Sequence, residues 1–379
     1  MSRRSWLGSS LVAATSVLLE GCSPSRNLPT VTPNASGPRA PIQLALNENP
    51  FGPSPLAIRA IEEQLGAVAR YTSEEADSLS RQIAALEQVP GDQVVLGEVL
   101  EALGSYLVQE SGAAKEIAYS TPGYTVLGDA ARAAGGAAVS VALDARLEND
   151  LAALGAHVGQ ATRALFLVNP HNPSGTVSDA AAFHAFVREM AQRTLVIVDE
   201  AYLEFVDDFA ARTCVAHTRS GENVVVFRTF SKIYGLAGLP FGYAIAPAPL
   251  AQALKARGVG HPRSLNRLAV VAASASLRDT AFLAVVRAKV ARERTRWSRV
   301  LDSLGLRHTD ARGNFVFFES GRPHAELAAA MRARGVEIGR SFPPLEGWTR
   351  ISVGLPEENA LAQSILRDVL HPNASELRR

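Results

Sequence analysis

Short apolar runs alternate with helical patterns along the middle of the chain. Six runs of four to six residues read as apolar on both faces: Glu116–Tyr119, Ala137–Ala142, Leu165–Val168, Leu195–Asp199, Val224–Arg228 and Tyr243–Ala246. Strands that are buried on both faces are typical of parallel sheets, and the patterns between them, such as Asp179–Gln192 and Pro249–Arg257, indicate crossover helices. We therefore predict an α/β fold with a mostly parallel sheet.

A different pattern follows beyond residue 279. An uninterrupted amphipathic segment, Thr280–Leu304, precedes a strand at Phe315–Phe318, a helix at Ala325–Arg334, a strand at Thr349–Val353 and a helix from Glu357. This order indicates a smaller α+β domain joined by a long helix. We expect a large domain at 71–279, a small domain at 280–379, and an N-terminal segment, 42–70, that packs with the small domain.

Composition excludes several classes of protein. The 379 residues carry 38 Lys and Arg against 37 Asp and Glu, so clustered positive charge for nucleic-acid binding is not expected. The two cysteines, Cys22 and Cys214, exclude a disulfide framework, and we expect Cys214 to be buried and inert. Because no His, Cys, Asp or Glu group has metal-ligand spacing, we expect no metal site.

The first residues resemble an export signal. Arg3 and Arg4 precede the uncharged stretch Leu7–Leu19, a pattern typical of twin-arginine signals, and the next residues end at Cys22 like the lipid-attachment box of a lipoprotein. We expect a signal at 1–22, a flexible tether at 23–41, and an exported protein, periplasmic or anchored to the membrane through Cys22, rather than a cytoplasmic one. Signal cleavage nearby without lipid attachment, or a misassigned start codon, are the alternatives.

Two predicted strands end in loops that carry polar side chains. Asn172 follows one strand within a turn that two Asn-Pro steps constrain, which fits a fixed amide donor or only a turn. Asp199 ends the next strand, with Tyr202 three residues later. A carboxylate buried there needs a cationic or hydrogen-bonding partner, unless it caps the following helix.

A lysine follows a third strand. Lys232 comes after Val224–Arg228, with the hydroxyl groups of Thr229 and Ser231 nearby. A partly desolvated lysine amine is a good nucleophile for Schiff-base formation, and the hydroxyl groups suit an anion. The alternative is a lysine whose amine extends to the surface.

Several ordered motifs together resemble one family, the pyridoxal-phosphate (PLP) aminotransferases of fold type I (class I/II), and most closely the histidinol-phosphate aminotransferase group. The resemblance runs from Pro41 to Leu370 and rests on Leu46–Gly52, Asn169–Thr176, Val198–Tyr202, Ser231–Lys232 and Thr349–Gly354. It implies a large domain with a mostly parallel, seven-stranded sheet and a smaller α+β domain.

The resemblance assigns roles around the cofactor. Lys232 would form the Schiff base with PLP and then move the proton, while Asp199 would keep the pyridine nitrogen protonated. Asn172 and Tyr202 would bond the phenolic oxygen of the ring, and Tyr124 would stack on it.

The resemblance also assigns anion-binding residues and an assembly. Thr229 and Ser231 fall at phosphate-contacting positions, and Tyr71 resembles the tyrosine that this family lends to the neighbouring subunit, which implies a homodimer. Arg350 matches the arginine that binds the substrate carboxylate or phosphate. Arg340 and Asn47 are further substrate-binding candidates.

Two positions depart from the family pattern. Pro240 stands where the family has an arginine that binds the cofactor phosphate, and a proline offers neither charge nor N–H. Glu98 and Glu101 lie in the segment where the family has a Gly/Ser-containing phosphate loop. We therefore expect weaker phosphate binding than in the family.

Three functions are compatible with these residues. The favoured one is amino-group transfer between an amino acid or amine, histidinol-phosphate-like or aromatic, and a 2-oxo acid. A PLP-dependent decarboxylase or lyase of an amino-acid phosphate is the second, because one fold supports several reactions. A catalytically inactive, exported binding protein is the third.

Overall fold

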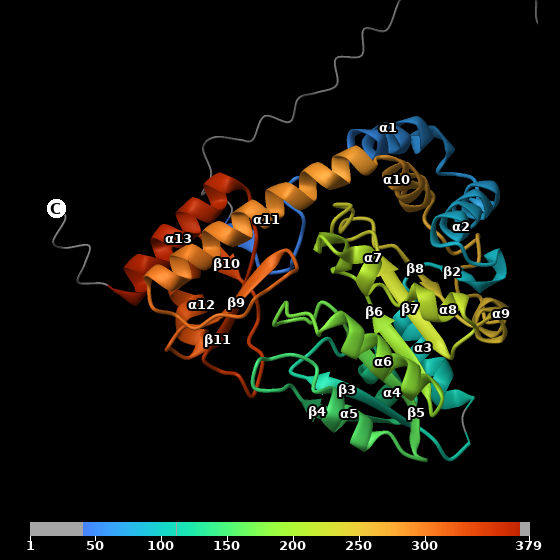
Figure 1. The fold of residues 1–379 in the computed structure, drawn as a ribbon. Helices are drawn as coiled ribbons and strands as arrows, with labels where there is room; N and C mark the ends of the chain where they lie inside the picture. Colours follow the sequence, from blue (N-terminus) through green and yellow to red (C-terminus); the bar gives the residue numbers. More distant parts are fainter. Residues whose placement is uncertain (1–40, 111, 372–379) are drawn as a thin grey trace, which may run out of the picture. The chain divides into compact units, whose positions relative to one another are not determined.

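A sheet of seven strands forms the centre of the large domain (Figure 1). In the computed structural model, which describes residues 41–110 and 112–371, its order is β2-β8-β7-β6-β5-β3-β4. The strands are β2 (Val94–Leu96), β3 (Glu116–Thr121), β4 (Ala137–Ala142), β5 (Thr162–Val168), β6 (Leu195–Asp199), β7 (Val224–Thr229) and β8 (Gly242–Ile245). β3 to β7 pair in parallel, whereas β8 runs antiparallel to β7 and β2. The mostly parallel, seven-stranded sheet predicted from the sequence is confirmed.

Helices pack on both faces of this sheet because its central strands are apolar on both sides. Leu165 and Leu167 of β5 join one apolar core, while Ala164, Phe166 and Val168 join a second one. The helices of the large domain are α2 (Ser73–Glu87), α3 (Val99–Gln109), α4 (Val126–Ala133), α5 (Leu151–His157), α6 (Ala180–Ala191), α7 (Phe209–Arg212), α8 (Val215–Arg219), α9 (Ala248–Ala256) and α10 (Arg267–Arg278). Short 3₁₀ turns occur at Leu65–Ala67, Gly91–Gln93 and Leu203–Phe205.

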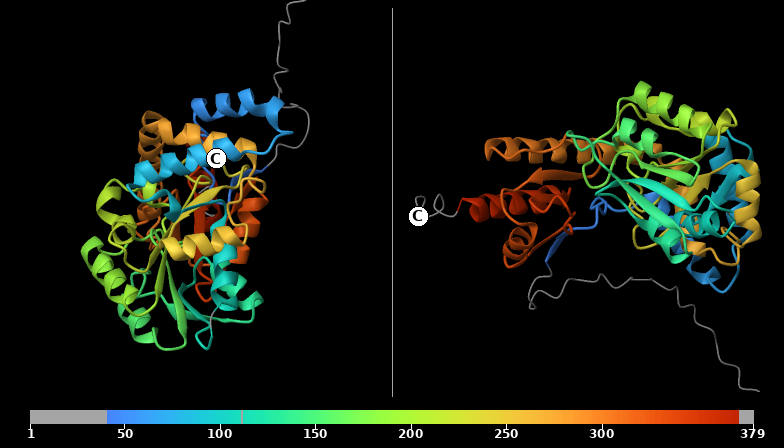
Figure 2. Two further views of the ribbon diagram at one scale, coloured as in Figure 1. Left: turned by 90° about the vertical axis from the view of Figure 1, so that its right-hand side faces the viewer. Right: turned by 90° about the horizontal axis from the view of Figure 1, so that it is seen from below.

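The long helix α11 (Thr280–Ser303), orange in Figure 2, connects the large domain to the small one. The small domain contains β9 (Phe315–Glu319), α12 (His324–Arg332), β10 (Val336–Ile338), β11 (Trp348–Ser352) and α13 (Pro356–Leu370). β9 and β11 are antiparallel. The elements that the sequence indicates here are all present, with ends that differ by one or two residues.

The N-terminal segment divides between the two domains. β1 (Ile42–Leu44) pairs in parallel with β10, whereas α1 (Pro55–Gln64) packs against α10. Between them the chain passes the carboxyl edge of the large sheet, where it contributes to the site described below.

Two further observations concern the ends and membrane crossing. The predicted signal (1–22) and the tether (23–41, apart from Pro41) lie outside the described residues. Within the described ranges, no single helix has the length and apolar composition to cross a bilayer, and only the pair α10 and α11, bent by 84°, reaches that threshold jointly.

Candidate active site

The register of the large sheet brings three strand ends together. Val168 of β5 pairs with Asp199 of β6, and Asp199 pairs with Phe227 of β7. Because the carboxyl ends of parallel strands share one edge of a sheet, the loops that follow β5, β6 and β7 meet at one place.

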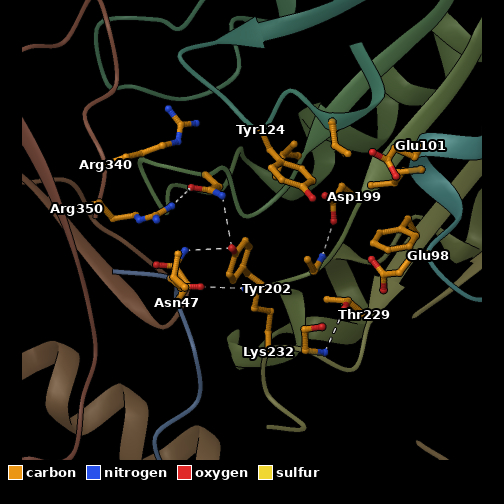
Figure 3. Close-up of a pocket in the computed structure, with 18 residues that line it drawn as sticks. Asn47, Glu98, Glu101, Tyr124, Asp199, Tyr202, Thr229, Lys232, Arg340 and Arg350 are labelled. Carbon is orange, nitrogen blue, oxygen red and sulfur yellow. Dashed lines mark hydrogen bonds between the residues drawn. The ribbon is translucent and has the colours of Figure 1, made fainter. Parts of the chain in front are cut away.

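A cavity of about 300 Å³ lies at this edge (Figure 3). Ten of the eleven predicted site residues line it: Asn47, Tyr124, Asn172, Asp199, Tyr202, Thr229, Ser231, Lys232, Arg340 and Arg350. In Figure 3 the two arginines lie on one side of the cavity, and Glu98 and Glu101 lie on the opposite side. The cavity therefore has a cationic side and an acidic side, with Lys232 and Asp199 between them.

Asp199 is buried at the end of β6 and lines the cavity, with 2% of its surface exposed. Its Oδ1 accepts a hydrogen bond of 2.9 Å from the backbone N–H of Ala201, so it does not cap a helix. Burial raises the pKa of Asp199 to about 7, although the charge of Lys232 opposes this effect. A cation within the cavity would stabilise its ionised form, as a protonated pyridine nitrogen would.

Lys232 is partly buried and lines the cavity. Its Nζ donates a hydrogen bond of 3.2 Å to the backbone oxygen of Leu46 and lies 5.8 Å from the centre of the Tyr202 ring. Leu46 belongs to the N-terminal segment that crosses the edge of the sheet. This segment therefore holds the amine near the other polar groups.

Tyr202 connects two amides in the cavity. Its hydroxyl oxygen accepts hydrogen bonds from Nδ2 of Asn47 at 3.1 Å and from Nδ2 of Asn172 at 3.5 Å. Its ring packs edge-on against Phe315 of the small domain, with 5.2 Å between the ring centres. These contacts place Asn172 and Tyr202 side by side, as the predicted shared role requires.

Arg350 extends from β11 into the same cavity, with 7% of its surface exposed. It donates hydrogen bonds to Oδ1 of Asn172 at 2.5 Å and to the backbone oxygen of Ala45 at 2.8 Å. Burial, together with the charge of Arg340, lowers its pKa to about 10, so it remains a cation at neutral pH. Its Nε is buried and has no hydrogen-bond partner among the described residues, whereas its two terminal nitrogens are held by Asn172 and Ala45.

Tyr124 and Tyr71 lie in different environments. Tyr124 follows β3 and lines the cavity with 40% of its surface exposed, and desolvation of its phenol together with the charge of Asp199 raises the pKa of that group. Tyr71 lies elsewhere, with 69% of its surface exposed and its backbone oxygen accepting a hydrogen bond from Arg267. Tyr71 is thus a surface residue that does not line the cavity of its own chain, so its side chain could contact a cofactor only in the site of another subunit.

The side of the cavity near α3 offers both donors and negative charge. The Glu98 side chain does not bond the first N–H groups of α3, and Thr229 and Ser231 add hydroxyl groups nearby. N–H groups at a helix start can bind a phosphate. However, Glu98 and Glu101 line the same cavity, and the pKa of Glu98 is raised by partial burial and by the charge of Glu101. Pro240 is solvent-exposed and adds no cation.

Several contacts around the site had no signal in the sequence. The backbone oxygens of Ala45 and Leu46 accept bonds from Arg350 and Lys232, and a main-chain acceptor leaves no pattern of residue types. Arg228 forms a buried ion pair with Glu200, 3.0 Å away, and a second with Glu87. Its position inside an apolar strand was the one available hint, because a buried arginine requires carboxylate partners.

The expectation of no metal site rested on sequence spacing, which does not report residues that come together from different elements. In the structure His184 of α6 comes close to Cys214 and His217, which lie three residues apart at the start of α8. Cys214 is buried and free, as expected, and burial raises the pKa of its thiol. Packing of α6 against the segment before α8 creates this group.

The residues present fit PLP at the ring end. Lys232 would supply the amine, Asp199 an acceptor for the ring nitrogen, Asn172 and Tyr202 donors for the phenolic oxygen, and Tyr124 an aromatic ring. The fit is weaker at the phosphate end because two carboxylates share it. The α/β architecture with this amine and carboxylate at the sheet edge defines a PLP-dependent enzyme of fold type I.

Comparisons with known proteins agree with this class. The family model described as aminotransferase class I and II matches residues 39–362, so the chain belongs to this family and is a PLP-dependent aminotransferase. It is 33% identical over 340 residues to a histidinol-phosphate aminotransferase of Limosilactobacillus fermentum, with 88% of this chain and 92% of the relative covered. It is 36% identical over 337 residues to the corresponding protein of an Anaeromyxobacter species, covering 86% of this chain and 90% of that one.

A solved structure shows the same fold. The crystal structure of a histidinol-phosphate aminotransferase from Sinorhizobium meliloti, in complex with pyridoxal-5'-phosphate, superposes with a TM-score of 0.79. The two sequences are 28% identical, and the match covers 91% of this chain and 96% of that chain. These findings favour the aminotransferase over the lyase and the inactive binding protein.

Proposed function

We propose that this aminotransferase acts on an amino acid or amine that carries an anionic group, histidinol-phosphate-like or aromatic, with a 2-oxo acid as the amino acceptor. The observation that carries the proposal is the pair Arg340 and Arg350 on one side of the cavity, opposite the acidic side. A planar guanidinium binds a carboxylate or a phosphate through two parallel hydrogen bonds.

Bound PLP supplies an electron sink for the negative charge that develops at the substrate Cα. Asp199 keeps the ring nitrogen protonated, and Tyr202 and Asn172 hold the ring oxygen. Lys232 moves a proton at its Nζ, since the amine lies between the ring-binding groups and the arginines. Arg350 orients the substrate, because its cationic side chain lines the cavity and is fixed through Asn172 and Ala45.

A screen of amino donors tests this function. Holoenzyme is mixed with one amino donor at a time, among them histidinol phosphate, phenylalanine and an amine that has no anionic group. The change in the visible absorption of the cofactor is recorded. We expect the anionic donors to convert the cofactor to its amino form and 2-oxoglutarate then to yield glutamate. Release of carbon dioxide without glutamate would support the lyase instead, and Lys232→Ala serves as the inactive control.

The protein would act as a homodimer. Three apolar side chains, Leu65, Val68 and Tyr71, are exposed within seven residues of chain, which is typical of a surface covered by a partner. If Tyr71 completes the neighbouring site, mixing Lys232→Ala with Tyr71→Ala subunits should restore one of the two sites in each heterodimer, which is up to about a quarter of all sites in a random mixture. Activity that stays at the sum of the two variants would contradict a shared site.

The protein would also be exported in folded form and tethered through Cys22. The support is the sequence pattern of Arg3, Arg4 and Leu7–Leu19, all outside the described residues. We expect the double variant Arg3→Lys, Arg4→Lys to stay in the cytoplasm. We expect Cys22→Ser to be exported but released from the membrane fraction. Unchanged fractionation of both variants would refute export by this route.

A further inference from the structure

Three potential metal ligands converge outside the active-site cavity. His184 lies on α6, His217 lies on α8, and Cys214 directly precedes α8. One ligand atom from each residue lies within 4.8 Å of the other two. Cys214 and His217 are almost fully buried, with 0% and 2% of their surfaces exposed, whereas His184 is partly exposed.

The outer nitrogen of each imidazole faces an atom that can only accept a hydrogen bond. Nδ1 of His217 lies 2.8 Å from the carboxylate oxygen Oε2 of Glu222. Nε2 of His184 lies 3.1 Å from the backbone oxygen of Ala211. Each of these two nitrogens must therefore carry the hydrogen, because neither oxygen can donate one.

This assignment leaves two lone pairs facing each other. The inner nitrogens, Nδ1 of His184 and Nε2 of His217, lie 2.9 Å apart, and in the neutral rings neither has a hydrogen to donate. Two acceptors at that distance repel unless a proton or a metal ion lies between them. A proton would create an imidazolium next to Glu222, but Arg188, 3.5 Å from that carboxylate, already supplies a positive charge there.

We propose that His184 Nδ1, His217 Nε2 and Cys214 Sγ bind a divalent transition-metal ion, with zinc as the ion that this set suits best. Two imidazoles and one thiolate are preferred zinc ligands, and water would complete a tetrahedral site on the partly exposed side of His184. Binding displaces one proton from the thiol to solvent, and the thiolate then forms the bond to the metal.

The surroundings match those of a metal site. Ligating histidines commonly donate their other N–H to a carboxylate or a backbone oxygen, as His217 does to Glu222 and His184 does to Ala211. The backbone N–H of Cys214 also donates a hydrogen bond of 2.6 Å to Glu200. Since Glu200 follows Asp199, the ion would fix α6 and α8 against the strand that carries the cofactor's acceptor.

Cobalt binding to the holoenzyme tests the proposal. After treatment with a chelator and dialysis against Co²⁺, we expect one bound equivalent by elemental analysis and a thiolate-to-cobalt absorption band in the difference spectrum against zinc-loaded holoenzyme. Zinc should displace the cobalt and raise the melting temperature, because a ligand that binds only the folded state stabilises it.

Matched variants identify the ligands. Cys214→Ser should abolish the thiolate band and weaken metal binding at least about 10-fold, whereas Cys22→Ser should leave both unchanged. His184→Gln should also weaken binding, while His308→Gln, whose Nε2 contacts Asp302 at 3.2 Å, should not. Absence of bound cobalt in the wild type would overturn the proposal and show that the two imidazoles share a proton instead. An unchanged thiolate-to-cobalt band in Cys214→Ser would also overturn it.

Discussion

Replacement of Asp199 by asparagine should stabilise the cofactor-free protein and weaken the holoenzyme. The carboxyl is buried at the end of β6, and its pKa rises from 3.8 to about 7 because burial disfavours the charged form. Each pKa unit corresponds to about 1.4 kcal/mol, so ionised Asp199 costs the folded, cofactor-free protein on the order of 4 kcal/mol.

The pH dependence follows from the direction of this shift. Between about pH 4 and pH 7 the unfolded chain has lost the proton of Asp199 while the folded chain keeps it. The free energy of unfolding therefore falls as the pH rises through this range and stays low above pH 7. Asparagine cannot ionise, so the variant and the wild type should be similar at pH 4 and differ most at pH 8.

Urea unfolding of both proteins after removal of PLP measures this difference. Asp208→Asn is the matched control, because the pKa of this largely exposed carboxyl is lowered by its hydrogen bond from Arg212. The control should gain no stability at pH 8. If Asp199→Asn is no more stable than the wild type at pH 8, or shows the same advantage at pH 4, burial of the charge is not the cause. With PLP bound the order should reverse, since the variant lacks the partner of the ring nitrogen.

Three further perturbations address other parts of the site. Pro240→Arg introduces a cation and should tighten PLP binding about 10- to 100-fold, and Glu98→Gln should give a smaller gain. Titration of the cofactor-free proteins with PLP, followed by visible absorbance, measures these affinities, and unchanged affinity in both variants would show that the cofactor phosphate binds elsewhere. Arg350→Lys loses the two-pronged contact and should raise KM for anionic donors about 10-fold at unchanged PLP affinity, while equal kinetics would remove Arg350 from substrate binding. Arg228→Met leaves the buried carboxylates of Glu87 and Glu200 without their cation and should lower the free energy of unfolding by roughly 3–5 kcal/mol. Urea denaturation measures this loss, and an unchanged free energy of unfolding would contradict the prediction.

The parts of the fold that the sequence predicts are those with local signals. β5, β6 and β7 were predictable because each is a short apolar run followed directly by a polar motif. Parallel strands bring those motifs to the same edge of the sheet, so the sequence alone was enough to place Asn172, Asp199 and Lys232 there. Tyr124 and Arg350 could be placed only through the family resemblance, because one aromatic ring or one arginine after a strand is not specific.

The parts that could not be predicted depend on long-range packing. The N-terminal segment reaches Lys232 because β1 pairs with β10, and a three-residue strand leaves no periodic signal. His184 and Cys214 meet because α6 packs against the segment before α8, and no motif spacing connects two different elements. A resemblance based on motifs cannot find such a pair, since the residues belong to no shared local pattern.

The alternation of side chains along β6 connects the predictable and the unpredictable parts of the site. Successive residues of an extended backbone point to opposite faces, so Asp199, the last residue of β6, lines the cavity, while Glu200, directly after the strand, pairs with Arg228 and accepts the N–H of Cys214. One stretch of backbone therefore positions both carboxylates. Because Glu200 is adjacent to Asp199 in the backbone, we expect displacement of Glu200 from its buried partners to shift Asp199 as well. The cofactor's acceptor thus depends on a buried ion pair that takes no part in the chemistry, which is why the motif residues alone do not make the site.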